Sequence, residues 1–231
     1  YTFLVIIATV VLQSLTAGAA TRALGLAEAE PNGVLIVGAN GVARAIAQAL
    51  VKQGFRVKLA DTSYEEIRSA RMAGLETYYG DPISSHADQY LELVGIGRLF
   101  AMSRRARWNT LACLKYRGEF GPKRVFSLRN AEERDVSDRE RPADEFRAPR
   151  LFGNDITYQK LASLLARGAE IRAINLNAEF DFVAYKEKNG SSILPMFTLT
   201  ADGKLRVIND DAPVEEMSEG KLLALVWSVE G

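Results

Sequence analysis

The chain has 231 residues, a formal net charge of zero and hydrophobic side chains at 48% of its positions. This composition supports a sizeable buried core, and the balanced charge argues against nucleic acid as a partner. One cysteine, Cys113, and one histidine, His86, exclude a disulfide framework and leave no histidine pair for a metal site. We expect Cys113 to lie in the core and His86 to be a solvated residue at a helix start.

The first segment carries no charged side chain from Tyr1 to Thr21. As a helix it would be about 30 Å long. Its second half is rich in small and weakly polar residues, which are typical of helices packed inside membrane bundles. We therefore predict that residues 1–24 end a last transmembrane helix, with Arg22 on the cytosolic side. A signal peptide without a basic start and a soluble helix without a polar face are the alternatives.

A short linker, residues 25–33, precedes a region in which strand and helix patterns alternate. Apolar runs predict parallel strands at 34–37, 56–60, 76–79, 98–102 and 124–128. Helical spacing between them predicts helices at 41–53, 62–74, 84–94 and 105–117. Such alternation is typical of right-handed βαβ units. We therefore expect an α/β fold over residues 34–147, with a Rossmann-like doubly wound parallel sheet.

The pattern changes after the fifth strand. Residues 129–150 are mostly charged and read as a solvated helix or linker. A helix at 156–168 and strands at 173–185, 193–200, 205–209 and 221–229 follow. The Asn-Gly pair in KNGS, 188–191, predicts a hairpin that joins the first two of these strands, and ADGK predicts a second hairpin. Residues 148–231 are thus expected to form a helix plus an antiparallel β domain.

The turn after the first strand has the composition of a phosphate-binding loop. Gly38 permits a tight turn, and Gly41 opens a helix whose first backbone N–H groups and dipole attract a phosphate. Ala43 is small enough for the helix to pack closely on the strand, as the third glycine of G-x-G-x-x-G does. Asn40 replaces the second glycine. The residues leave two interpretations open, a nucleotide site and a Rossmann-type scaffold that has lost its ligand.

Asp61 ends the second strand, 23 positions after Gly38. A carboxylate there can accept hydrogen bonds from ribose hydroxyls and disfavours the 2′-phosphate of NADP. We find no Tyr-x-x-x-Lys pair and no Cys/His pair near the carboxyl ends of the strands. The sequence therefore predicts neither a catalytic residue nor a metal ligand, and we expect the chain not to be an enzyme. An NAD-dependent oxidoreductase with an N-terminal anchor remains the enzyme alternative.

Several stretches resemble known families. TVVLQSLTAGAATRALGL, 9–26, looks like the final transmembrane helix of bacterial sodium/proton antiporters of the cation/proton antiporter family. GANGVARAIAQAL, LADTS, GLETYYGD and RRARWNTLAC resemble the N-terminal domain of regulators of potassium conductance, the RCK or TrkA-N domain. LFGNDITYQKLASLLARGAEI, followed by hairpins, is similar to the tail of such antiporters. The order of these segments is more specific than any one of them.

The resemblance implies a cytosolic regulatory domain that senses a nucleotide for a sodium or potassium ion transporter in the inner membrane. It implies NAD or an AMP/ATP-type nucleotide as the ligand, a homodimer, and the membrane-embedded antiporter domain of the same chain as a partner. Carried over, the phosphate turn consists of Gly38, Asn40, Gly41 and Ala43. The remaining predicted ligand contacts are the ribose residues Asp61 and Thr62, Asp81 near the adenine, and Asn109 facing the cleft.

The same residues have simpler interpretations. Asp61 could cap the next helix, Asp81 could only make the turn before Pro82, and Asn109 could be a surface residue of its helix. Trp108 lies in a basic run, Arg104, Arg105 and Arg107. This run fits an exposed face with one packed aromatic ring, or a surface for a partner or bilayer headgroups. A nucleotide-free interaction domain is the third candidate function.

Overall fold

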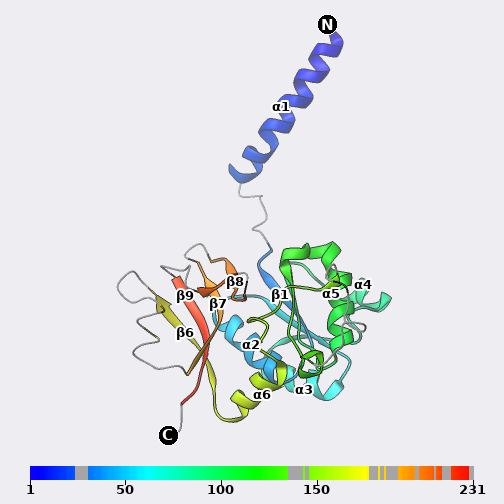
Figure 1. The fold of residues 1–231 in the computed structure, drawn as a ribbon. Helices are drawn as coiled ribbons and strands as arrows, with labels where there is room; N and C mark the ends of the chain where they lie inside the picture. Colours follow the sequence, from blue (N-terminus) through cyan, green and yellow to red (C-terminus); the bar gives the residue numbers. More distant parts are fainter. Residues whose placement is uncertain are drawn as a thin grey trace. The chain divides into compact units, whose positions relative to one another are not determined.

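The computed structural model describes residues 1–23, 31–134, 143, 146–176, 182, 185, 192–200, 203–210, 212–214 and 220–228. The chain divides into two compact units, Tyr1–Pro31 and Asn32–Gly231. The first unit contains one helix, and the second contains both predicted sheets (Figure 1).

The first unit is built on α1, Thr2–Ala23, so the helix predicted for this segment is confirmed. Its large apolar side chains near the start, such as Phe3 and Leu4, are exposed. Among the residues that the structure describes, however, no helix is both long and apolar enough to span a membrane. The transmembrane assignment is therefore not supported.

The second unit contains the predicted parallel sheet. Its strands are β1 (Gly33–Val37), β2 (Val57–Asp61), β3 (Glu76–Tyr79), β4 (Ile96–Ala101) and β5 (Val125–Ser127). Their order is β3-β2-β1-β4-β5 and every pair is parallel, which confirms the doubly wound α/β fold. The central strand β1 is buried along its whole length, as its unbroken apolar run predicts.

Four helices connect these strands: α2 (Gly41–Lys52), α3 (Tyr64–Met72), α4 (Ser85–Tyr90) and α5 (Ala106–Phe120). Asn40, Ser63 and Ser84 cap the first three of these helices by accepting a backbone N–H bond. The helix predicted at 84–94 is shorter than expected, because Leu91 adopts an extended backbone and buries its side chain. His86 is an exposed residue at the start of α4, as predicted, and its Nδ1 lies 2.7 Å from the hydroxyl of Tyr78.

The second sheet is antiparallel, as predicted, but its strand order differs from the expected one. It follows α6 (Tyr158–Ala166) and contains β6 (Glu170–Leu176), β7 (Ile193–Leu199), β8 (Leu205–Val207) and β9 (Gly220–Val226). The order is β6-β9-β7-β8, so the β7–β8 hairpin is confirmed. Direct pairing of β6 with β7 is wrong, because β9, whose four central residues are buried, lies between them. The KNGS turn at 188–191 lies outside the described residues.

The charged region after β5 returns to the sheet where the structure describes it. A 3-10 turn, Pro122–Arg124, precedes β5, and a second one, Ala131–Arg134, follows it. Residues 149–151 then run beside β5, where Ser127 N donates to the Pro149 carbonyl (2.9 Å) and Leu151 N donates to the Ser127 carbonyl (3.1 Å). The prediction of a solvated linker over 129–150 is therefore wrong for the last residues of this range. Positions 135–142 lie outside the described residues.

The two sheets share one apolar core. Phe100 of β4 stacks on Phe197 of β7 with ring centroids 5.5 Å apart, and Phe152 packs edge-on against Phe197 at 5.1 Å. All three rings are at least nine-tenths buried. Aromatic pairs in this geometry add stabilisation beyond that of the buried area. Phe197 thus joins the β-rich part to the parallel sheet.

Substituting Phe197→Ala should lower the free energy of unfolding by about 3–5 kcal/mol, because a fully buried ring is replaced by a cavity. Urea unfolding followed by circular dichroism measures this loss. The matched control is Met72→Ala, whose side chain is 80% exposed and should change stability by no more than about 0.5 kcal/mol. A loss below about 1 kcal/mol for Phe197→Ala would show that the rings do not hold the sheets together.

Candidate functional site

The ends of β1 and β4 converge at Gly38. Its φ is +105°, and a Cβ built there would lie 2.8 Å from the backbone nitrogen of Ser103. The strands are tied together at this point, since Met102 N donates to the Val37 carbonyl at 2.7 Å. Only glycine satisfies both the backbone angle and the close approach. The tight turn predicted at Gly38 is therefore present, and it places the α2 N-terminus beside the carboxyl end of β4.

Asn40 is integrated into this turn rather than obstructing it. Its Oδ1 accepts from Ala43 N (3.1 Å) and its Nδ2 donates to the Met102 carbonyl (2.7 Å), while the residue is only 3% exposed. The side chain thus caps α2 and bridges it to β4. Gly41, the first residue of α2, is exposed, and an added Cβ would meet nothing closer than Arg44 Nη2 at 3.8 Å. The helix start is therefore open on the Gly41 side.

Asp61 joins the glycine turn to the following helix. One carboxylate oxygen accepts from Ala39 N (2.7 Å) and the other accepts from Ser63 N (2.8 Å). Ser63, not Asp61, caps α3, because its hydroxyl accepts from Glu66 N. A carboxylate has about four acceptor positions, so these two bonds leave capacity for hydroxyl donors. Asp61 is partly exposed and can serve both purposes.

These residues surround a cleft of about 210 Å³. Four of the eight predicted site residues line it: Gly38, Asn40, Asp61 and Thr62. Ala43 is fully buried and packs in the core, as a small residue at this position should. The other lining residues are Val37, Ala60, Ser63, Glu66, Pro82, Ser103, Arg104, Arg105 and Trp108.

Asp81 and Asn109 do not line the cleft. Asp81 Oδ1 accepts from Ile83 N (2.9 Å), so this residue forms the turn before α4. Asn109 is 1% exposed, and its amide is paired in both directions with the backbone of Ser103, at 2.8 and 2.9 Å. Asn109 therefore neither faces the cleft, as predicted, nor lies on the surface, as the alternative interpretation had it. Asn109 instead fixes the conformation of Ser103, which does line the cleft.

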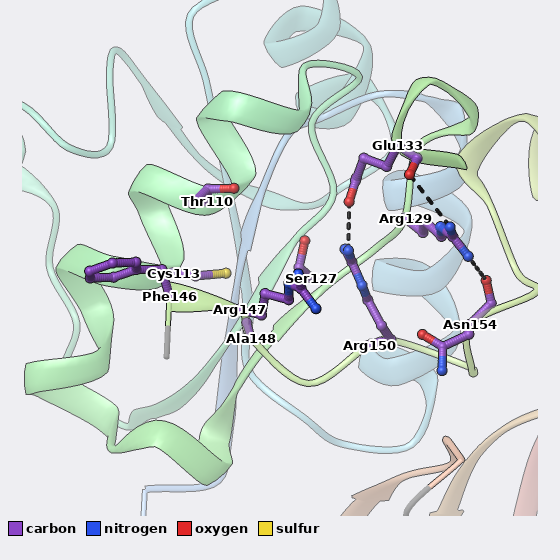
Figure 2. A pocket seen from close by; sticks show the side chains of 10 residues that line it. All are labelled: Thr110, Cys113, Ser127, Arg129, Glu133, Phe146, Arg147, Ala148, Arg150 and Asn154. Atoms are coloured by element: carbon purple, nitrogen blue, oxygen red, sulfur yellow. Dashed lines mark hydrogen bonds and ion pairs between the residues drawn. The ribbon is translucent and has the colours of Figure 1, made fainter. Parts of the chain in front are cut away.

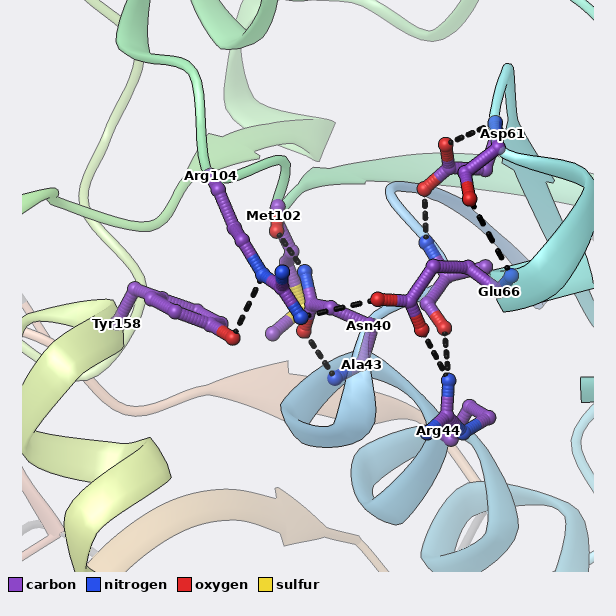
Figure 3. Close-up of polar contacts among 10 residues, drawn as sticks. Asn40, Ala43, Arg44, Asp61, Glu66, Met102, Arg104 and Tyr158 are labelled. Carbon is purple, nitrogen blue, oxygen red and sulfur yellow. Dashed lines mark hydrogen bonds and ion pairs between the residues drawn. The ribbon is translucent and has the colours of Figure 1, made fainter. Parts of the chain in front are cut away.

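A chain of charged contacts closes one side of the cleft. It joins residues that lie far apart in the sequence. Glu66 of α3 pairs with Arg44 of α2 through one oxygen and with Arg104 Nη2 through the other, at 2.9 Å. Arg104 Nε also donates to the hydroxyl of Tyr158 on α6 at 2.9 Å (Figure 3). We call these four residues the Glu66 network. Arg104 belongs to the basic run after the fourth strand, which the sequence alone indicates as an exposed face.

The cleft is lined by side chains of both charges. Arg104 and Arg105 contribute two guanidinium groups, and Asp61 and Glu66 contribute two carboxylates. The hydrogen bond to Tyr158 raises the pKa of Arg104, so its cation is favoured. Backbone donors and cations on one side and Asp61 on the other can bind a phosphate and a diol, respectively. Among the described residues, no group of three or more His, Cys, Asp and Glu side chains could hold a metal ion.

Comparison with known proteins identifies the region around the cleft. No curated protein matches the sequence. The solved structures it resembles include an NAD(P)-binding domain of an exopolyphosphatase-related protein from Archaeoglobus fulgidus, at 14% identity, covering 58% of this chain and 95% of that one, with a TM-score of 0.43. The TrkA-N domain of the inner membrane protein ybaL from Escherichia coli is similar at 15% identity, 58% and 94% coverage and a TM-score of 0.42.

The GsuK RCK domain is similar at 14% identity, with 87% of this chain and 45% of that chain covered and a TM-score of 0.43. The family model for the TrkA-N domain matches residues 34–145, which contain all five parallel strands beyond the first residue of β1 and every residue of the cleft lining. Residues 34–145 are therefore similar to TrkA-N domains, and their parallel sheet has the Rossmann-like fold.

Proposed function

We propose that this chain is the nucleotide-sensing regulatory part of a monovalent cation/proton antiporter that transports sodium or potassium. The TrkA-N domain supports a regulatory role, and the resemblance of the flanking segments to antiporter sequences supports the transport context. The observation that carries the proposal is the cleft itself. There, the Asn40 cap at the start of α2, two arginines and Asp61 surround one space of about 210 Å³.

The ligand we propose is NAD or an adenine nucleotide such as AMP or ATP. Its phosphates would lie at the start of α2, where backbone N–H groups and the helix dipole favour an anion, with Arg104 and Arg105 nearby. Its ribose hydroxyls would donate to Asp61. A 2′-phosphate would be placed against the carboxylates of Asp61 and Glu66, so NADP is disfavoured.

The Glu66 network offers a route by which the ligand would act beyond the cleft. A bound phosphate would compete with Glu66 for the guanidinium of Arg104, which also holds Tyr158 of α6. Releasing Tyr158 would alter how α6 and the following strand β6 pack on the domain. Coupling of this kind is typically about 1–3 kcal/mol and requires that the ligand bind two arrangements with different affinity.

We further propose that the domain acts as a homodimer, that its partner is the transport domain of the same protein, and that it makes and breaks no covalent bonds. The last point rests on the lining of the cleft. The described lining residues contribute carboxylates, guanidiniums, hydroxyls and one indole, but no histidine, cysteine, tyrosine or lysine that would exchange a proton with a nicotinamide substrate.

A second candidate function is a nucleotide-free interaction domain. Asn40 supports this alternative, because its amide already occupies the Ala43 N–H that a phosphate at the helix start would use. In that case the cleft would only stabilise the turn. The two candidates differ in whether a nucleotide binds.

Isothermal titration of the purified chain with NAD, AMP and ATP should show binding of at least one of them. Gly38→Val should abolish it, since a side chain at φ +105° meets the backbone of Ser103 and displaces the turn. Circular dichroism of the variant checks that the fold persists. If none of the three nucleotides binds, the sensing role is excluded and the interaction domain is favoured.

A pair of matched variants separates loss of binding from loss of folding. Gly41→Leu places a side chain over the start of α2, whereas Gly118→Leu places one in equally open space on α5. Both variants should fold, as thermal melting would show. We expect Gly41→Leu to weaken nucleotide binding at least roughly tenfold, about 1.4 kcal/mol, and Gly118→Leu to bind as the wild type does. Equal affinities would place the ligand away from the helix start.

The oxidoreductase alternative makes the opposite prediction for turnover. The purified chain should not oxidise NADH in the presence of small aldehydes and ketones, as followed by absorbance at the nicotinamide band. The two carboxylates of the cleft, Asp61 and Glu66, are already engaged by backbone N–H groups and by arginines, and the other described lining residues include no histidine, cysteine, tyrosine or lysine. Sustained oxidation above the background without protein would refute the sensing proposal in favour of catalysis. A Gly38→Val sample provides the matched control for contaminating activity.

A further inference from the structure

A second cavity of about 270 Å³ lies between α5, the end of β5 and the chain segment that runs back beside β5 (Figure 2). It shares no lining residue with the Gly38 cleft. Thr110 and Cys113 contribute the α5 wall, and Ser127 contributes the β5 wall. The remaining wall is formed by Arg129, Glu133, Phe146, Arg147, Ala148, Arg150 and Asn154.

The described lining of the cavity is rich in arginine, although Arg147 already interacts with another group. Three guanidinium groups line it, those of Arg129, Arg147 and Arg150, and among its described lining residues Glu133 is the one carboxylate. Arginines that share a partly enclosed space repel one another, and an anion between them relieves this repulsion. The charge of the lining therefore favours an anionic ligand.

The contacts of Glu133 show that it does not neutralise the whole cluster. One of its oxygens accepts from Asn130 N (3.0 Å), and the other pairs with Arg150 Nη2 (2.6 Å). Arg129 instead donates to backbone carbonyls, those of Asn154 (2.8 Å) and Glu133 (3.5 Å). Carbonyls orient a guanidinium without cancelling its charge. The side chain of Arg150 is 23% exposed, so its charge is also only partly solvated.

The uncharged walls suit an anion with a small organic part. Thr110 and Ser127 lie on the α5 and β5 sides and carry hydroxyl groups. Burial raises the pKa of the Cys113 thiol to about 12, so this side chain stays neutral and does not repel an anion at physiological pH. Phe146, which is 45% exposed, adds an aromatic surface at the rim.

We propose that this cavity is a second binding site, which takes a small phosphate-bearing anion other than the nucleotide of the Gly38 cleft. Arginine forks match the tetrahedral oxygens of a phosphate better than any other side chain does. Arg129 and Arg150 enter from the end of β5 and from the returning segment, so an anion between them joins two stretches of chain. Asn154 extends this link, because its backbone N–H donates to Asp210 beyond β8 (2.9 Å).

The test uses sn-glycerol 3-phosphate as the probe, in isothermal titrations of the full chain. We expect binding by the wild type and at least tenfold weaker binding by Arg129→Gln and by Arg147→Gln. Arg172→Gln, which changes an exposed arginine of β6, is the matched control and should bind within twofold of the wild type. Thermal melting of each variant confirms that it is folded.

Two further arms locate the site and define its chemistry. Gly41→Leu should retain the probe, because it alters only the start of α2, so failure of the nucleotide proposal leaves this one standing. Succinate, a dianion without phosphate, should bind at least tenfold more weakly than sn-glycerol 3-phosphate. No heat with the probe, equal binding by the arginine variants, loss of binding in Gly41→Leu or equal binding of succinate would each overturn the proposal.

Discussion

The close approach of Gly38 to the backbone of Ser103 is the contact on which the rest of the site depends. It brings the first and fourth strands of the parallel sheet within hydrogen-bonding distance just past their carboxyl ends, where strand order reverses and open α/β sheets hold their ligands. Asn40 then fixes the start of α2 to β4, and Asp61 fixes the same turn to α3. Each of these bonds requires the turn to be tight. Without a glycine at this position, the three elements could not meet around one cleft.

Polar side chains around the parallel sheet mainly hold backbone in place. Asn109 bonds Ser103 through both amide atoms, and Ser84 caps α4. Arg98 holds backbone in place between the two sheets, because it donates to the Leu205 carbonyl and to the side chain of Asn32. Desolvation by burial lowers the pKa of Arg98 to about 10. Leaving a buried polar atom unpaired costs free energy, and Arg98 bears part of this cost, because its Nε has no hydrogen-bond partner among the described residues. The apolar contact of Phe100 with Phe197 supplies stabilisation between the two sheets that these hydrogen bonds do not.

The sequence was sufficient for whatever depends on local pattern. The apolar run of β1, the glycine turn and the spacing of α2 are local, and the parallel sheet follows from their alternation. It was not sufficient where distant side chains decide the outcome. Arg104 meets Glu66 and Tyr158 across separations of 38 and 54 residues. Strand β9 pairs between β6 and β7 although it comes last in the chain. Asn109 was misplaced for a local reason. Its helix position was correct, but the direction of its amide depends on the backbone of Ser103, six residues earlier.

Asn40 has one consequence for energetics. Since its amide already satisfies the first turn of α2, the loop is preorganised. If a nucleotide binds as we propose, little conformational entropy would be lost in ordering the loop, and more of the binding energy would be left to shift the balance between two arrangements. Under the same proposal, a bound nucleotide would stabilise the folded domain, and its thermal stability would rise with nucleotide concentration above the dissociation constant.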